Sequence, residues 1–76
     1  MPARLREIIA ICAERYGITV EKPSSGSHWK CKRDGCRTYP IPAHNGERSE
    51  IPDQYIRALC RNFGIDYDEM KRLLEQ

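Results

Sequence analysis

The sequence lacks the features that mark several large functional classes. No apolar run approaches membrane-spanning length, and charges separate the N-terminal apolar residues, so we expect neither a membrane segment nor a signal peptide. Glycine-rich phosphate loops, nucleophile elbows and paired-carboxylate sites do not stand out either. These absences predict a cytoplasmic protein without a cofactor.

The four cysteines lack the paired C-x-x-C spacing that is typical of zinc sites. Cys12 and Cys60 fall on apolar helical faces, as small core residues do. Cys31 and Cys36 lie across a predicted hairpin, where zinc binding with a histidine is the alternative to two reduced thiols. A disulfide is not expected in the cytoplasm, and no cysteine has an activating neighbour. We therefore expect no metal site.

The charge is small but unevenly distributed. The 76 residues allow one small domain, 1–76, and their net charge of +2 does not by itself indicate nucleic-acid binding. Between Lys22 and Gly46, however, Asp34 is the only acid. The basic residues of this stretch are Lys22, Lys30, Lys32, Arg33 and Arg37. The middle of the chain is therefore the candidate surface for a polyanion.

Apolar spacing predicts helices at both ends of the chain. An amphipathic helix is expected from Pro2 to Tyr16, with Gly17 at its C-terminal end. A second helix is expected to begin near Asp53 and to end at Gly64, and a last short helix to begin after Asp66. Between them, residues 18–22, 28–33 and 37–41 have the composition of three strands, the last an edge strand that ends near its prolines.

The register of the hairpin decides which side chains share a face. A two-residue turn at Asp34-Gly35 pairs Cys31 with Thr38. A three-residue loop, 34–36, instead separates an apolar face from a polar face that carries His28, Lys30 and Lys32, and we prefer it for that reason. The predicted fold class is α+β, with the order helix, three-stranded antiparallel sheet, helix and short helix, arranged like a double-stranded RNA-binding domain.

The predicted polar face has the side chains needed to cleave a phosphodiester. Lys30 and Lys32 are spaced along the strand by about 7 Å, comparable to the spacing of phosphates in a nucleic-acid strand. Such a face can hold an RNA backbone and present a ribose 2′-hydroxyl to His28, which can accept or donate a proton near neutral pH. The alternative is an ordinary solvated face with an idle histidine.

His44 follows the edge strand in a polar loop and is expected to lie near His28. Two neighbouring histidines allow paired acid and base roles. The alternative is a loop residue that shapes the turn or binds a partner.

Three segments together resemble one known family. They are Gly26-Ser27-His28, Ile41-Pro42-Ala43-His44-Asn45-Gly46 and Phe63-Gly64-Ile65. In this order, and over nearly the whole chain, they are similar to the HicA (YcfA-like) toxins of bacterial type II toxin–antitoxin systems. The chain differs from the usual family pattern at Cys31, at Asn45-Gly46 and between Arg48 and Tyr55.

The resemblance implies a double-stranded RNA-binding-domain-like fold and a metal-independent endoribonuclease that cleaves messenger RNA. It implies that His28 is the catalytic residue. It also implies a HicB-like antitoxin that covers the active face. The expected RNA-binding residues are Ser27, Lys30, Lys32, Arg33, Arg37 and His44. Two alternatives stay open: a non-catalytic domain of the same fold that binds RNA or a protein partner, and a zinc-stabilised structural module.

Overall fold

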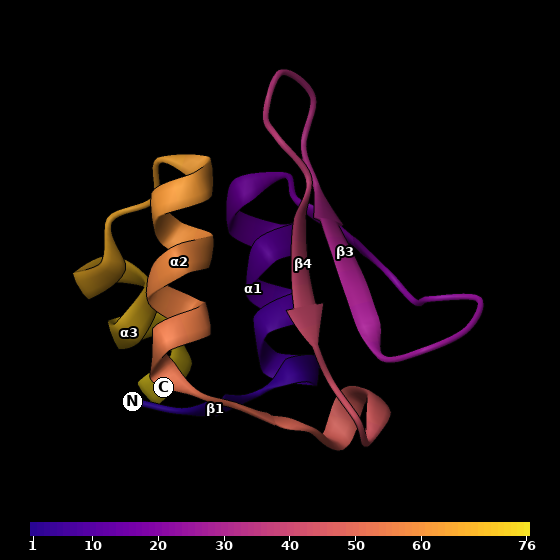
Figure 1. Cartoon of the computed structure of the whole chain (residues 1–76). Coiled ribbons are helices and arrows are strands. Elements are labelled where there is room, and N and C mark those ends of the chain that lie inside the picture. Colours follow the sequence, from indigo (N-terminus) through magenta and orange to yellow (C-terminus); the bar gives the residue numbers. More distant parts are fainter.

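Helices cover one face of a small antiparallel sheet in the computed structural model, which describes residues 1–76 (Figure 1). The larger elements, in chain order, are α1 (Leu5–Tyr16), β2 (Thr19–Glu21), β3 (His28–Lys32), β4 (Tyr39–Pro42), α2 (Asp53–Phe63) and α3 (Tyr67–Glu75). The smaller ones are β1 (Ala3–Arg4), the 3-10 helix η1 (Gly46–Arg48) and β5 (Glu50–Ile51). The predicted α+β class is confirmed.

The central strand β3 has the register of the three-residue loop. Trp29 pairs with Ile41 and Cys31 pairs with Tyr39 in the antiparallel β3–β4 ladder. Trp29, Cys31 and Ile41 are buried against the helices, while the intervening residues of β3 are exposed. A slip of one residue would turn these apolar side chains to solvent, so burial of one face determines the register.

Strand β4 forms one edge of the sheet, and its prolines block that edge. The backbone N–H of Ala43 donates to the carbonyl oxygen of Ser27 over 2.7 Å, which extends the ladder by one pair. Because backbone groups alternate in direction along a strand, the nitrogens of Pro40 and Pro42 face outward. Neither has a hydrogen to donate, so this edge offers a poor template for another strand.

The core lies between the sheet and the three helices. Leu5 and Ile8 of α1, Ile56 and Leu59 of α2 and Met70 of α3 are all almost completely buried in one apolar cluster. The two longer helices end as predicted, with Gly17 and Gly64 in the left-handed region at φ 63° and 70°.

The N-terminal boundary differs from its prediction. The first helix begins at Leu5 and not at Pro2, because Ala3–Arg4 pair with Glu50–Ile51 in a two-stranded sheet. The N–H of Leu5 donates to the carbonyl oxygen of Ser49 over 2.9 Å. The polar loop expected after residue 42 therefore contains η1 and β5, which tie the segment back to the start of the chain.

Candidate nucleic-acid interface

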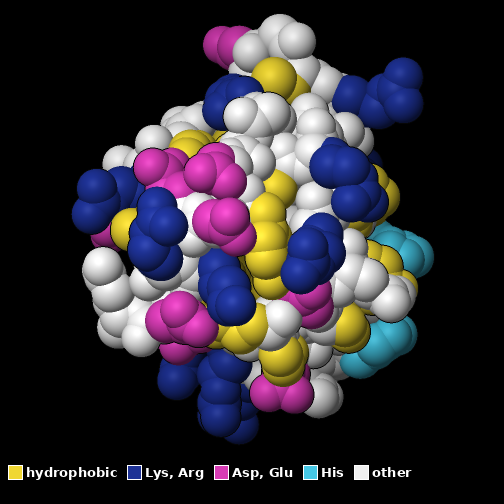
Figure 2. Space-filling model, turned by 90° about the vertical axis from the view of Figure 1, so that its left-hand side faces the viewer, with side chains coloured by type: hydrophobic (Ala, Val, Ile, Leu, Met, Phe, Trp, Pro, Cys, Tyr) yellow, Lys and Arg dark blue, Asp and Glu magenta, His cyan; other side chains and the backbone are white.

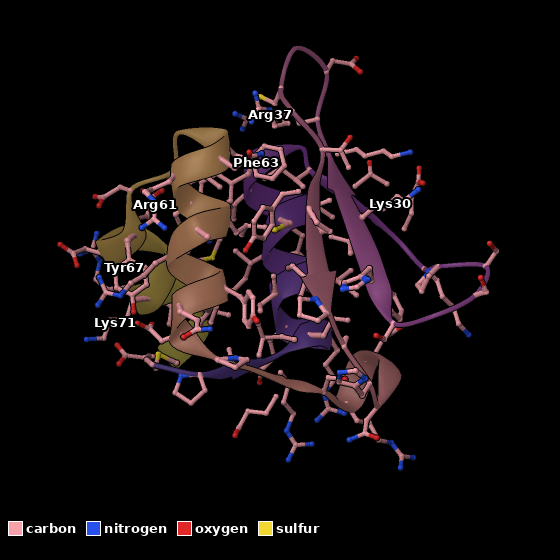
Figure 3. All side chains as sticks on the ribbon, in the orientation of Figure 1. Lys30, Arg37, Arg61, Phe63, Tyr67 and Lys71 are labelled. Carbon is pink, nitrogen blue, oxygen red and sulfur yellow. The ribbon has the colours of Figure 1, made fainter.

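The exposed face of β3 carries the predicted row of His28, Lys30 and Lys32. All three side chains are exposed, and they alternate with Trp29 and Cys31, whose burial keeps the row turned to solvent. Figure 3 shows Lys30 pointing away from the helices. The sheet therefore brings one imidazole and two ammonium groups onto a single accessible face.

One of the two lysines in the row has an acidic partner. Lys32 Nζ lies 3.0 Å from Glu21 Oε1 on β2, and both side chains are about half exposed. An exposed pair of this kind contributes little to stability and is easily exchanged for another anion. Lys30 forms no ion pair, although Glu21 is its strand partner. Lys30 is therefore the lysine of the row whose ammonium group has no acidic partner within the protein.

Arg33 does not lie on the exposed face of β3, although it was expected to be one of the RNA-binding residues. Its guanidinium donates to the carbonyl oxygens of Tyr16 over 3.3 Å and of Phe63 over 2.6 Å. It also stacks on the Phe63 ring at 5.5 Å from the ring centroid. These carbonyls belong to the last residues of α1 and α2, where a cation is favourable. Arg33 therefore joins two helix ends.

Arg37 lies outside the row as well. Its backbone carbonyl accepts a hydrogen bond from Asn62 Nδ2 over 2.7 Å, which ties the hairpin loop to α2. Its side chain is exposed, and Figure 3 shows it beside the end of α2 near Phe63. Arg37 therefore adds positive charge around the hairpin loop, at a different place from the face that carries His28.

Both histidines lie on the same side of the molecule. The hydrogen bond between Ala43 and Ser27 brings the residues before His44 and His28 together. The two side chains are exposed, and Figure 2 shows both histidines at the same edge of the molecule, separated by other side chains, beside a surface where acidic and basic side chains are mixed. The expected proximity of His44 to His28 is supported by this pairing. Ser27 itself is half-buried at their junction.

A cavity of about 320 Å³ lies beside His44. It is lined by Pro42, Ala43, His44, Asn45, Ser49, Glu50, Pro52 and Tyr55. Ser49 is buried, and its hydroxyl oxygen accepts a hydrogen bond from the backbone N–H of Asn45 over 2.8 Å, which holds the loop in place. Sequence reasoning missed Tyr55 as a site residue. Its helical spacing placed it on the inner face, but it is only half-buried.

A more open hollow of about 650 Å³ lies at the η1 end of the sheet. Lys22 and Arg48 contribute positive charge to it, Glu47 contributes negative charge, and the edge of Trp29 forms part of its wall. The hollow is open and mixed in charge. It extends the accessible polar surface without adding a group suited to proton transfer.

The buried cysteines are unsuited to chemistry. Burial raises the pKa of Cys12 and of Cys31 to about 12, and that of Cys60 to about 11. Thiols are nucleophiles and metal ligands only as thiolates, so these three stay inert at neutral pH. No three His, Cys, Asp or Glu side chains converge as metal ligands would. The exposed face of β3 therefore presents imidazole and ammonium groups, while the thiol of Cys31 is buried on the opposite face.

Comparisons with protein-family models, with curated proteins and with solved structures found no match to this chain. None of the helices is both long enough and apolar enough to cross a lipid bilayer. A function is therefore inferred from the chemistry of the exposed residues.

Proposed function

We propose that this protein is a metal-independent endoribonuclease that cleaves messenger RNA, and that it is the toxin of a type II toxin–antitoxin pair of the HicA kind. The observation that carries the proposal is the position of His28, exposed in one row with Lys30 and Lys32 on the open face of β3. The order helix, three antiparallel strands, helix supports a double-stranded RNA-binding-domain-like fold.

The row suggests how RNA is bound. Lys30 and Lys32 contact successive phosphates, with Lys32 exchanging Glu21 for the RNA backbone. Contacts to phosphate and ribose carry little sequence information, which suits a nuclease that acts on many messages. Arg37 binds RNA further along the strand, around the hairpin loop.

The reaction requires only one bond to form and one to break. The imidazole of His28 takes the proton from a ribose 2′-hydroxyl, the 2′-oxygen bonds to the adjacent phosphorus, and the bond from phosphorus to the 5′-oxygen breaks. Lys30 stabilises the charge that develops on the phosphate oxygens. General base catalysis of this kind accelerates a reaction by about 10²–10⁴-fold. The 5′-oxygen gains a proton as it leaves, so the products are a 2′,3′-cyclic phosphate and a 5′-hydroxyl, and water then opens the cyclic phosphate to a 3′-phosphate.

A HicB-like antitoxin is the proposed partner. A toxin of this kind acts in the cytoplasm and has to be blocked until it is needed. The row on β3 is the surface that such a partner covers, since it holds the reacting groups and is fully accessible. Acidic side chains on the partner would pair with Lys30 and Lys32 and would exclude RNA.

The first test compares wild type with His28→Ala. Purified protein is incubated with messenger RNA in the presence of a metal chelator, and the ends of the fragments are identified. We expect wild type to leave cyclic phosphate or 3′-phosphate ends and His28→Ala to lose about 10²–10⁴-fold in rate without losing RNA affinity. Induced expression in bacteria should arrest growth and deplete RNA with wild type only.

Two lysines provide a matched control for the binding surface. Lys30 and Lys71 are both exposed, but Figure 3 shows Lys71 on α3, across the molecule from Lys30. Lys30→Ala should weaken RNA binding and Lys71→Ala should not. A folded His28→Ala variant that still arrests growth and cleaves RNA would refute the catalytic role. RNA binding without cleavage in wild type would favour a binding domain instead.

A further inference from the structure

We infer that His44 is a second catalytic residue, which donates a proton to the 5′-oxygen as it leaves, while the departing nucleoside occupies the cavity beside His44. This inference rests on the proposed ribonuclease activity. It assigns the loop after β4 a chemical role and divides the proton transfers between two imidazoles.

The ladder between β3 and β4 brings the two histidines to the same end of the sheet. His28 pairs with Pro42, and the bond from Ala43 to Ser27 continues this register by one more pair. His44 follows Ala43 directly, in the turn beyond the end of β4, so its backbone lies one residue from the pair that adjoins His28. The inference requires that one phosphodiester bound at this end of the sheet lies within reach of both rings.

Neither ring is engaged by another group. No side-chain hydrogen bond or ion pair of the protein involves the ring of His28 or of His44, and the only ion pairs lie at Met1, Lys32 and Arg57. The charged and titratable groups nearest the two rings come from the exposed face of the sheet and from the cavity. Lys30 shares the exposed face of β3 with His28, and Glu50 on β5 and Tyr55 on α2 line the cavity with His44, while Glu21 on β2 pairs with Lys32.

The cavity indicates which histidine serves the leaving group. Pro42 is the strand partner of His28 and also lines the cavity that contains His44 and Tyr55. Its volume of about 320 Å³ lies at the lower end of the range for small-molecule sites. The lysine row runs the other way from His28, so RNA on the 2′-hydroxyl side follows β3. The nucleoside on the 5′-oxygen side then enters the cavity.

The proton balance closes without a further reactant. His28 gains the proton of the 2′-hydroxyl as the bond from the 2′-oxygen to phosphorus forms. Protonated His44 loses a proton to the 5′-oxygen as the bond from phosphorus to that oxygen breaks. RNA is the only reactant, and proton exchange with water restores both rings after the products leave.

The test replaces the 5′-oxygen at the cleavage site by sulfur in a short RNA. A thiolate leaves without being protonated, so this RNA no longer needs a proton donor. His44→Ala and His44→Asn should cleave the oxygen RNA about 10²–10⁴-fold more slowly than wild type. Both should cleave the sulfur RNA within about tenfold of wild type. His28→Ala should be slow on both, and Ser25→Ala, an exposed loop control, should match wild type.

Each outcome has one meaning when thermal unfolding shows that the variant is folded; His44→Asn replaces His44→Ala if the latter is not. Recovery of the His44 variants on the sulfur RNA supports the inference. Equal slowing on both RNAs, normal rates on both, or recovery of His28→Ala instead would overturn it while leaving the ribonuclease in place. Absence of cleavage by wild type would refute the proposed function, and the inference with it.

Discussion

At the scale of the single residue, Arg33 was expected to bind RNA, but its charged side chain stabilises the fold instead. Arg33 and Arg37 flank the same hairpin loop and both belong to the basic stretch. The guanidinium of Arg33, however, spans the ends of two helices, while only the backbone of Arg37 makes a tertiary hydrogen bond. Strand parity turns Arg33 to the same side as Cys31, toward the helices.

Replacing Arg33 should therefore destabilise the fold. Arg33→Ala removes two hydrogen bonds to helix-end carbonyls and the stacking on Phe63, so the free energy of unfolding should fall by about 1–3 kcal/mol. Arg37→Ala keeps its backbone bond and should change that free energy by no more than about 0.5 kcal/mol. Urea unfolding of both variants measures the difference. Equal effects would contradict a structural role specific to Arg33.

At the scale of the element, β4 shows how an edge strand is kept from pairing with other chains. Pro40 and Pro42 occupy the positions whose nitrogens face outward, while Ile41 and Tyr39 keep the ladder to β3. The prolines therefore cost no hydrogen bond within the sheet and remove two donors from its edge.

Restoring those donors should promote self-association. The double variant Pro40→Val and Pro42→Val gains two outward N–H groups on a β-branched edge, so dimers or larger species should form as the concentration rises. Thr38→Val adds a similar apolar side chain near this edge without a new N–H and should stay monomeric. Sedimentation velocity at several concentrations distinguishes them. A monomeric double variant would show that the prolines do not protect the edge.

At the scale of the whole molecule, Asp53 links three parts of the chain. The amino group of Met1 lies 2.5 Å from its carboxylate, the Tyr67 hydroxyl donates to it, and Arg57 Nε donates over 2.6 Å. The Arg57 guanidinium also stacks on Tyr67 at 4.1 Å. Hydrogen bonds from the Met1 amino group, Tyr67 and Arg57 lower the pKa of Asp53 well below its usual range.

This network should make stability depend on pH in the acid range. The folded state binds the ionised carboxylate, so its contribution is present above the ordinary carboxyl pKa of about 4 and is lost as the pH falls further. Asp53→Asn should lower the melting temperature at pH 7, and the difference from wild type should shrink toward pH 2. Asp34→Asn, at an exposed acid without a partner, is the control. A constant difference across this range would contradict the linkage.

The local pattern of the sequence by itself determined the register of the β3–β4 hairpin and the ends of the two longer helices. The alternation of polar and apolar residues in β3 specified both the register of the hairpin and the exposure of His28, Lys30 and Lys32, because only one register buries the apolar set. Gly17 and Gly64 ended the helices because they accept the left-handed conformation that the ends require.

Only the tertiary structure decided the rest. The pairing of β1 with β5, the use of Arg33 at two helix ends and the cavity that joins His44 to Tyr55 all depend on residues far apart in the chain. The segments β1, β5 and η1 are too short to show a periodicity of their own, and no local pattern indicates which residues of distant elements will meet. Their geometry follows from the packing of the helices on the sheet, which brings these segments together only after the core has formed.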